Sequence, residues 1–309
     1  MIENFRGRSF VSLLDYSTEE IRYILDLAIR MKNDYKAGKR ETPLAGKTLA
    51  MIFQKPSLRT MVSFQTGMHQ LGGHAIYLGP DQIGIGKRET TEDIAIVLSS
   101  MVDGIMARTF DHAIVEDLAK YSSKPVINGL TDFNHPCQIM ADFQTVLERR
   151  GRLEGLKLVY IGDGNNVATS LMFGAARMGM EMVMATPEGY SANPKALEIL
   201  KEKVPGFEVK HYIDPMEAAV GADILCTDAW FSMGQEKEAE ARRKIFGKYK
   251  IDVPMIDIAD PECVVLHCLP AHYGEEITHE AVRHPRSAVY QEAENRLHAQ
   301  KAIMALLMG

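Results

Sequence analysis

Short apolar runs alternate with amphipathic stretches along most of this chain. A first helix is predicted at about residues 18–37, because Ser17 and Glu20 form a capping box ahead of apolar residues at helical spacing. The runs that follow are typical of strands buried on both faces of a parallel sheet. In the first half they are Thr48–Phe53, Ala75–Leu78, Gly104–Ala107 and Pro125–Ile127, with helical patterns between them such as Met61–Leu71 and Ile94–Met101.

The alternation of apolar runs and amphipathic stretches is interrupted at the polar segment 149–152, which follows a helical stretch at Gln138–Arg149. A domain boundary is predicted there. The expected first domain is 1–150 and the second is 151–287. The second has strands at Leu156–Ile161, Met182–Ala185, Val209–Tyr212, Ile224–Cys226 and Val264–Leu266, and helices beginning near Asn166, Asn193 and Met216. A last helix, about 288–309, is expected to return to the first domain. The predicted fold class is α/β, with two domains that each hold a mostly parallel sheet flanked by helices.

The composition is that of a globular enzyme. The 309 residues are 46% hydrophobic and 25% charged, and the formal net charge of -6 lacks the basic excess of many nucleic-acid binders. No stretch approaches the roughly 18 uninterrupted apolar residues of a membrane helix. The four cysteines form no C-x-x-C pair, which favours a reducing compartment. We therefore expect a cytoplasmic protein without nucleic-acid or membrane partners, in which an anionic ligand needs a local basic site.

Such a basic site is predicted where the first strand leads into a helix, at residues 54–60. The free N–H groups of a helix N-terminus favour an anion, Ser57 and Thr60 add hydroxyl groups, and Arg59 adds a guanidinium. Taken alone, this segment is more simply a helix cap with a surface charge. Loops after other strands supply Arg108, His135 and Gln138. Because such loops meet at one sheet edge, we interpret the set as a phosphate site.

Four motifs resemble those of ornithine carbamoyltransferases, in the same order and spacing. They are Ser57-Leu58-Arg59-Thr60, His135-Pro136-Cys137-Gln138, Asp228 through Ser232-Met233-Gly234, and His267-Cys268-Leu269-Pro270. The resemblance covers essentially the whole chain. It implies a first domain that binds carbamoyl phosphate and a second that binds ornithine. It further implies formation of citrulline and phosphate in arginine metabolism, no metal or other cofactor, and a homotrimer or a multiple of trimers.

The resemblance also assigns individual residues. For carbamoyl phosphate it implies Ser57, Leu58, Arg59, Thr60, Arg108, His135, Gln138, Cys268, Leu269 and Arg296. For ornithine it implies Asn166, Asp228, Ser232 and Met233. The expected catalytic residues are Cys268, Arg108, His135 and Asp228. Arg108 and His135 would stabilise the developing charges, while Asp228 and Cys268 would orient and deprotonate the amine, with Cys268 in a positioning role. Lys87 is a candidate for reaching the site of a neighbouring subunit.

Leu58 and Met61 depart from the family pattern, which usually has threonine and arginine there, so acetylornithine and succinylornithine enzymes stay open as relatives. Features of the sequence also suggest three other functions. The segment 161–167 resembles a dinucleotide fingerprint, but Val167 replaces its third glycine. The cysteines and histidines at 263–272 suggest zinc, but lack the usual ligand spacing. The third is a non-catalytic relative that keeps only the fold. The presence of Arg59, Arg108, His135, Asp228 and Cys268 argues against it.

Overall fold

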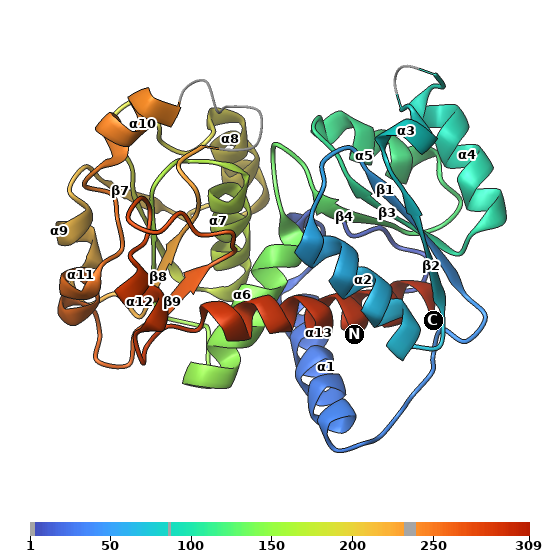
Figure 1. Ribbon diagram of the computed structural model, residues 1–309, viewed down its shortest axis with the longest axis horizontal. Helices are drawn as coiled ribbons and strands as arrows, with labels where there is room; N and C mark the ends of the chain where they lie inside the picture. The colour runs from blue at the N-terminus through green and yellow to red at the C-terminus, as the bar shows by residue number, and fades with distance from the viewer. Residues whose placement is uncertain (1–3, 86–87, 232–238) are drawn as a thin grey trace. The chain divides into compact units, whose positions relative to one another are not determined.

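The computed structural model describes residues 4–85, 88–231 and 239–309 (Figure 1). The chain divides into two compact units, one formed by 1–144 with 294–309 and the other by 145–293. These limits differ by a few residues from the predicted ones. The reason is that two helices, α6 (Pro136–Arg150) and α13 (Val289–Met308), each contribute residues to both units.

The first unit contains a four-stranded sheet in the order β2-β1-β3-β4, and all its ladders are parallel. Its strands are β1 (Thr48–Phe53), β2 (His74–Leu78), β3 (Gly104–Arg108) and β4 (Val126–Leu130). Its helical elements, besides parts of α6 and α13, are η1 (Leu13–Asp15), α1 (Thr18–Lys36), α2 (Leu58–Gln70), α3 (Pro80–Ile83), α4 (Thr91–Met101) and α5 (His112–Tyr121).

Local sequence determines where these elements begin and how closely they pack. The capping box predicted for α1 is confirmed, since Glu20 N donates to Ser17 Oγ (3.2 Å) and Ser17 N donates to Glu20 Oε2 (2.9 Å). On α2, a Cβ added to Gly67 would lie 2.7 Å from Met304 Cε on α13. The small residue thus lets the C-terminal helix pack closely against the last turn of α2, and a larger side chain there would require the Met304 methyl group to shift.

The second unit contains a five-stranded sheet in the order β7-β6-β5-β8-β9, again with parallel ladders throughout. Its strands are β5 (Lys157–Ile161), β6 (Glu181–Ala185), β7 (Val209–Tyr212), β8 (Ile224–Thr227) and β9 (Val264–His267). Its remaining helices are α7 (Asn166–Met178), α8 (Pro194–Lys203), α9 (Pro215–Ala219), α10 (Ala239–Phe246), α11 (Val253–Ile258) and α12 (His279–Arg283).

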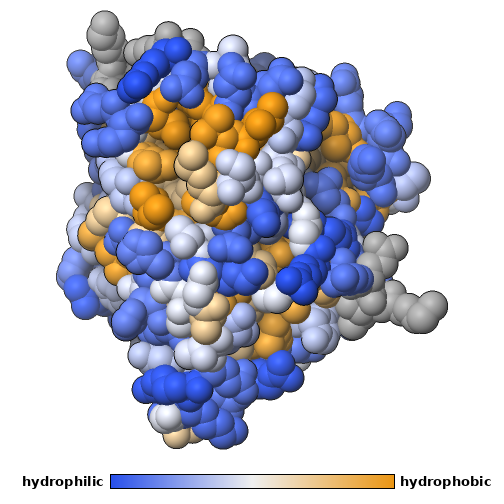
Figure 2. Space-filling model, turned by 90° about the vertical axis from the view of Figure 1, so that its right-hand side faces the viewer, coloured by the Kyte–Doolittle hydropathy of each residue, from blue (hydrophilic) through white to orange (hydrophobic). Residues whose placement is uncertain are grey.

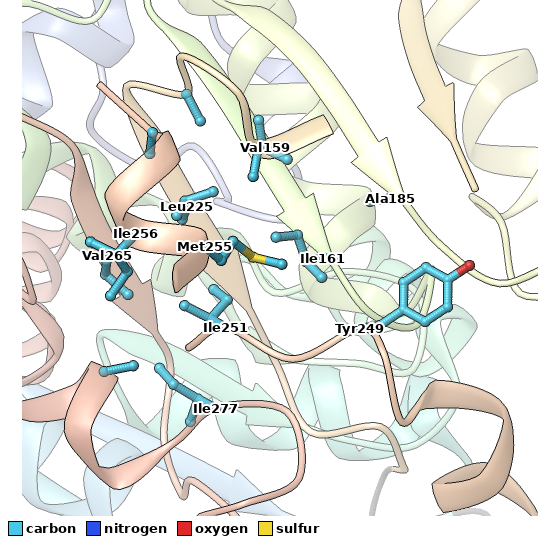
Figure 3. Packing of buried hydrophobic residues seen from close by; sticks show 14 of the residues in the cluster. Val159, Ile161, Ala185, Leu225, Tyr249, Ile251, Met255, Ile256, Val265 and Ile277 are labelled. Atoms are coloured by element: carbon cyan, nitrogen blue, oxygen red, sulfur yellow. The ribbon is translucent and has the colours of Figure 1, made fainter. Parts of the chain in front are cut away.

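The core of the second unit lies between the central strands and the helices near them. Val159 and Ile161 on β5 and Leu225 on β8 pack with Met255 and Ile256 of α11 in one buried cluster (Figure 3). Burial of β5 and β8 explains their almost uninterrupted apolar sequences. The predicted fold class, two parallel sheets flanked by helices with a C-terminal helix, is confirmed. Within the described ranges, no helix combines the length and apolar character of a membrane span.

Candidate active site

In the first unit, an anion-binding geometry forms at the start of α2. Ser57 is the N-cap, and its Oγ accepts from the backbone N–H of Thr60 at 3.4 Å and lies 3.1 Å from Thr60 Oγ1. The helix begins at Leu58, three residues earlier than the apolar pattern indicated, and the Leu58 side chain is 69% exposed. The sequence before Met61 therefore forms the first helical turn, where N–H groups and the helix dipole favour a phosphate.

Three helices of this unit meet through the side chain of Arg296. From α13, its Nη1 donates to Gln138 Oε1 on α6 at 2.8 Å, and its Nη2 donates to Thr60 Oγ1 on α2 at 3.2 Å. Gln138 in turn donates through Nε2 to Asp142 Oδ1 at 2.8 Å. All four side chains are buried. A guanidinium fixed among hydrogen-bonding groups at the N-terminal ends of α2 and α6 presents positive charge suited to a phosphate ligand.

His135 and Arg108 lie at the carboxyl-terminal edge of the same sheet. Arg108 is the last residue of β3, where the register with β4 shifts, and His135 directly precedes α6; both are buried. Burial, followed by the charges of Arg296 and Arg108, lowers the pKa of His135 well below its ordinary 6.5. The imidazole is therefore neutral at physiological pH, and it can offer one N–H to a substrate oxygen without adding a charge.

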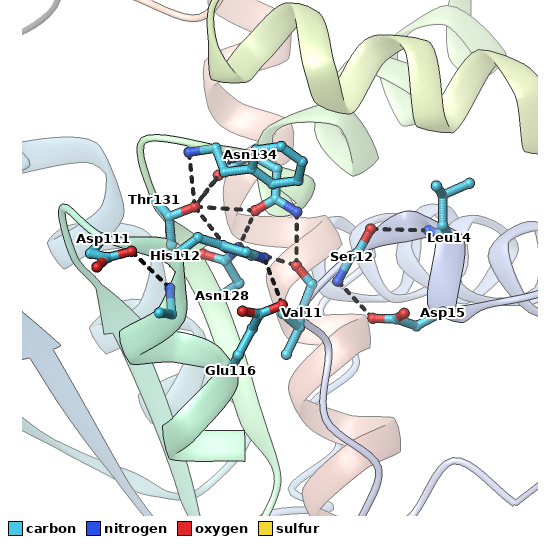
Figure 4. Close-up of polar contacts among 12 residues, drawn as sticks. Val11, Ser12, Leu14, Asp15, Asp111, His112, Glu116, Asn128, Thr131 and Asn134 are labelled. Carbon is cyan, nitrogen blue, oxygen red and sulfur yellow. Dashed lines mark hydrogen bonds and ion pairs between the residues drawn. The ribbon is translucent and has the colours of Figure 1, made fainter. Parts of the chain in front are cut away.

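The loop before His135 is held by a polar network (Figure 4). The backbone N–H of Asn134 donates to Thr131 Oγ1 (3.2 Å), and Thr131 N donates to the Asn134 carbonyl (2.9 Å). The side-chain amides of Asn134 and Asn128 both donate to the Val11 carbonyl, at 3.2 and 3.1 Å. Because these hydrogen bonds connect the loop to itself and to Val11, the backbone leading into His135 has a defined course.

Lys55 is a buried residue beside these loops to which the sequence assigned no role. Lys55, 5% exposed, forms an ion pair with Asp132 and lies 4.4 Å from the centre of the Phe110 ring. It thus connects the loops after β1, β3 and β4. Lys55 lies within the segment 54–60, which the sequence predicted to bind an anion, and this position could have indicated a role for it. Arg59, by contrast, is only half-buried and forms no hydrogen bond or ion pair with other described side chains.

In the second unit, Asp228 and Cys268 meet beyond the ends of β8 and β9. The Cys268 thiol donates to Asp228 Oδ1 at 3.0 Å, and the Ala229 N–H donates to the same oxygen at 2.8 Å. The other oxygen, Oδ2, accepts from Asn165 Nδ2 at 2.7 Å. Burial, then the charge and hydrogen bond of Asp228, raises the pKa of Cys268 well above its ordinary 9. The sulfur is a neutral thiol, which favours a positioning role over nucleophilic attack.

The segment after β9 has a constrained backbone. Leu269 has a φ of +58°, unusual for a residue with a side chain. Its N–H donates to His267 Nδ1 at 2.8 Å, and His267 Nε2 lies 3.0 Å from Glu276 Oε1. The His267 backbone N–H donates to Glu292 Oε2 at 2.8 Å. Since His267 and both glutamates are buried, they form a fixed support for the Cys268 thiol.

Several other predicted positions have different outcomes. Asn166 is the first residue of α7, but the amide that bonds to Asp228 belongs to Asn165. Ser232, Met233 and Lys87 lie outside the described residues.

A Cβ added to Gly164 would lie 2.2 Å from the carbonyl oxygen of residue 191, so this glycine allows a close approach of the chain to itself. In the part of the chain that the structure describes, no group of three metal-ligating side chains is assembled.

Two family models match the two halves of this chain. The family model "Aspartate/ornithine carbamoyltransferase, carbamoyl-P binding domain" matches residues 8–148, and "Aspartate/ornithine carbamoyltransferase, Asp/Orn binding domain" matches 154–307. Ornithine carbamoyltransferase from Thermococcus kodakarensis is 52% identical over 313 aligned positions, which cover 100% of this chain and 99% of the relative. The anabolic ornithine carbamoyltransferase from Pyrococcus furiosus is 50% identical, with the same coverage.

Solved structures show the same likeness in three dimensions. Ornithine carbamoyltransferase from Pyrococcus furiosus matches with a TM-score of 0.96 at 50% identity, covering 100% of this chain and 99% of that one. The enzyme from Thermus thermophilus matches with a TM-score of 0.87 at 42% identity, covering 97% and 99%. The chain belongs to the aspartate/ornithine carbamoyltransferase family and is a carbamoyltransferase.

Proposed function

We propose that this enzyme transfers the carbamoyl group of carbamoyl phosphate to the side-chain amine of ornithine, giving citrulline and phosphate for arginine biosynthesis. The observation that carries ornithine as acceptor is the carboxylate of Asp228, held against the Cys268 thiol at 3.0 Å. A fixed negative charge attracts a diamino acid and repels the second carboxylate of aspartate. Full-length relatives named ornithine carbamoyltransferase at about 50% identity support the same acceptor.

In the first unit, we propose that the start of α2 binds the phosphate through Ser57, Arg59, Thr60 and the backbone at Leu58. Arg296 is fixed at the same place by its bonds to Thr60 and Gln138. The exposed Leu58 side chain leaves the Ser57 cap intact, so the departure from the family pattern removes a hydroxyl without removing the helix N-terminus. Met61 lies in the same helix, beyond the cap.

Arg108, His135 and Gln138 are proposed to act on the carbamoyl group. Attack by the amine turns the carbamoyl oxygen into an oxyanion while the phosphate leaves with additional negative charge. Arg108 supplies positive charge, and neutral His135 supplies an N–H. A well-placed donor of this kind contributes roughly 3–4 kcal/mol to transition-state stabilisation in other acyl-transfer sites. The pKa of His135, lowered by burial and by the two arginines, keeps it a donor of constant charge across neutral pH.

In the second unit, Asp228 and Cys268 are proposed to bind and orient the acceptor amine, with Asn166, Ser232 and Met233 also binding ornithine. Leu269 and Cys268 are proposed to contact the carbamoyl group as well. The amine must lose a proton before it attacks, and an alkyl ammonium ordinarily has a pKa of about 10.4. Asp228 would accept or relay this proton. The thiol of Cys268 would hold the carboxylate in place, and no covalent enzyme intermediate is needed.

An assay of amine-dependent phosphate release from carbamoyl phosphate, with the carbamoylated product identified by mass spectrometry, tests the proposal with ornithine, putrescine, acetylornithine, succinylornithine and aspartate as acceptors. Ornithine should give the highest kcat/KM, because it alone combines a free side-chain amine with an intact α-amino acid group. Aspartate should give no measurable product. A higher kcat/KM for acetylornithine or succinylornithine would contradict the acceptor assignment, and the absence of a carbamoylated product with every amine would contradict the reaction.

We also propose that the protein forms a homotrimer, or a multiple of trimers, in the cytoplasm. Several large apolar side chains of the first unit are exposed, among them Val62, Ile76, Tyr77, Ile96, Val97 and Met101. Figure 2 shows apolar residues gathered on one face of the molecule. Extended apolar patches on soluble proteins commonly mark association surfaces. Light scattering after gel filtration should give about three times 34.5 kDa, or a multiple of that mass. A monomer mass would contradict this proposal.

A further inference from the structure

Asn165 connects the N-terminus of α7 to the proposed acceptor site. Its Oδ1 accepts from the backbone N–H groups of Val167 (2.9 Å) and Ala168 (3.2 Å) and from the Tyr160 hydroxyl (3.3 Å). These three donors fix which end of the amide is oxygen, so its Nδ2 is the atom that faces Asp228. That nitrogen donates to Asp228 Oδ2 at 2.7 Å. The orientation of this amide therefore follows from its surroundings.

The two carboxylate oxygens of Asp228 have different partners. Oδ2 accepts from Asn165, whereas Oδ1 accepts from the Ala229 N–H and from the Cys268 thiol. Rotation of the carboxylate about its terminal bond would break all three hydrogen bonds. By binding Oδ2, Asn165 helps to hold the carboxylate in the orientation that presents Oδ1 to the Cys268 thiol.

We infer that Asn165 is a positioning residue for carbamoyl transfer, which orients the Asp228 carboxylate toward the acceptor amine. The inference rests on the proposed function of Asp228 in binding ornithine, and it concerns a different residue from Asn166. The competing explanation is that Asn165 only caps α7, since asparagine is among the best N-cap residues. A test must therefore keep the cap and change only the contact with Asp228.

Asn165→Asp makes that separation. Aspartate is an equally good N-cap and is favoured by the helix dipole, so α7 should form. Its second oxygen, however, replaces the N–H donor that lies 2.7 Å from Asp228 Oδ2. Two carboxylates at this separation hold one shared proton at lower pH and repel each other at higher pH. The shared proton restores a hydrogen bond to Asp228, whereas full ionisation removes it.

The other ionisable residues near this network are the same in the variant and in the wild type. They are Tyr160, Cys226, Cys268, Glu292 and Asp163, the last paired with Arg242 at 2.8 Å. Burial raises the pKa of Tyr160 well above its ordinary 10, and the pKa of Cys268 is also raised, so both stay protonated in the range tested. The new carboxyl group is therefore the group whose titration distinguishes the variant from the wild type between pH 6 and 9.

We expect the kcat/KM of Asn165→Asp for ornithine, divided by the wild-type value at each pH, to fall roughly tenfold or more between pH 6 and 9. The KM for carbamoyl phosphate should stay within roughly twofold of wild type, because the change removes no group proposed to bind it. Asn165→Ser keeps a capping oxygen but cannot reach Asp228, and it should lower kcat/KM for ornithine by roughly tenfold at every pH. A constant ratio for Asn165→Asp would overturn the inference.

The matched control is Asn193→Asp, the same substitution at another N-cap of the second unit. Asn193 Oδ1 accepts from the Lys195 N–H at 3.0 Å at the start of α8. This variant has the same net charge as Asn165→Asp and should show a ratio that is constant with pH. An equal pH-dependent fall in both variants would overturn the inference, because a general effect of charge or capping would then explain it.

Alkylation of Cys268 by iodoacetamide without substrates, followed by mass spectrometry, gives a readout independent of catalysis. The added negative charge in Asn165→Asp should slow alkylation at pH 9 roughly tenfold, since it further disfavours the thiolate. Unchanged alkylation would overturn the link from Asn165 through Asp228 to Cys268. If alkylation slows while wild-type enzyme makes no citrulline, the link is supported and the proposed function is the part that fails.

Discussion

The Cys268 thiol is the feature of the proposed acceptor site whose removal has the most definite expected effect. In Cys268→Ala, Asp228 Oδ1 loses the donor that lies 3.0 Å away and keeps the Ala229 N–H at 2.8 Å. A hydrogen bond to a charged acceptor contributes about 1.5–3 kcal/mol. The corresponding loss in kcat/KM for ornithine is roughly 10- to 150-fold, provided that the bond is needed in the transition state.

Steady-state citrulline formation with each substrate varied, together with calorimetric titration of carbamoyl phosphate, measures this effect. Carbamoyl phosphate affinity should change by no more than about threefold, because the groups proposed to bind its phosphate are unchanged. Cys268→Ser restores an O–H donor and should recover much of the loss. Cys263→Ala is the matched control, since Cys263 is a buried core thiol of the same unit and has no assigned contact with substrate.

Two results would refute this reasoning. An equal loss of ornithine and carbamoyl phosphate binding would show that Cys268 does not act selectively on the acceptor. Complete inactivity of both Cys268→Ala and Cys268→Ser, with native folding, would indicate a nucleophilic thiolate. The latter would also conflict with the raised pKa of Cys268, which burial and the neighbouring Asp228 cause.

Two further substitutions test the first unit. Arg108→Ala should weaken carbamoyl phosphate binding and lower kcat by roughly 100-fold or more, as expected for loss of an oxyanion donor; unchanged steady-state kinetics would remove Arg108 from the site. Burial, then Lys32 and Lys301, lowers the pKa of His298 from 6.5 to about 4. Because the unfolded chain binds this proton first, the free energy of unfolding should fall by up to about 3 kcal/mol from pH 6.5 to 4. Urea unfolding should show a smaller fall in His298→Gln, and an identical fall would contradict the assignment.

The strands could be predicted from the sequence because parallel strands buried on both faces have continuous apolar runs. The limits of β1 are those predicted, whereas β4 continues past Ile127 to Leu130. Asn128 interrupts the apolar pattern there, yet its buried amide donates to the Val11 carbonyl, a contact from a distant part of the chain. Short helices such as α11 and α12 span too few turns to show a clear amphipathic period.

The residues of the candidate site were harder to predict from the sequence than the strands. Local geometry suggested the anion-binding start of α2, but Arg296 entered only through resemblance, because packing of α13 brings it to Gln138 and Thr60. The choice between Asn165 and Asn166 depends on which neighbouring side chain faces Asp228. Sequence position alone does not contain that information. Lys55 was likewise inside the segment 54–60, while its partner Asp132 lies after another strand.

The position of Arg296 also has a consequence for how the protein is made. The first unit includes 1–144 and 294–309, so roughly 150 residues must be translated between its two parts. At about 5–20 residues per second, this separation corresponds to roughly 8–30 s. The nascent chain can form its first parallel sheet during that interval, but the hydrogen bonds from Arg296 to Thr60 and Gln138 cannot exist yet. The proposed carbamoyl phosphate site is therefore complete only after residues 294–309 have been synthesised.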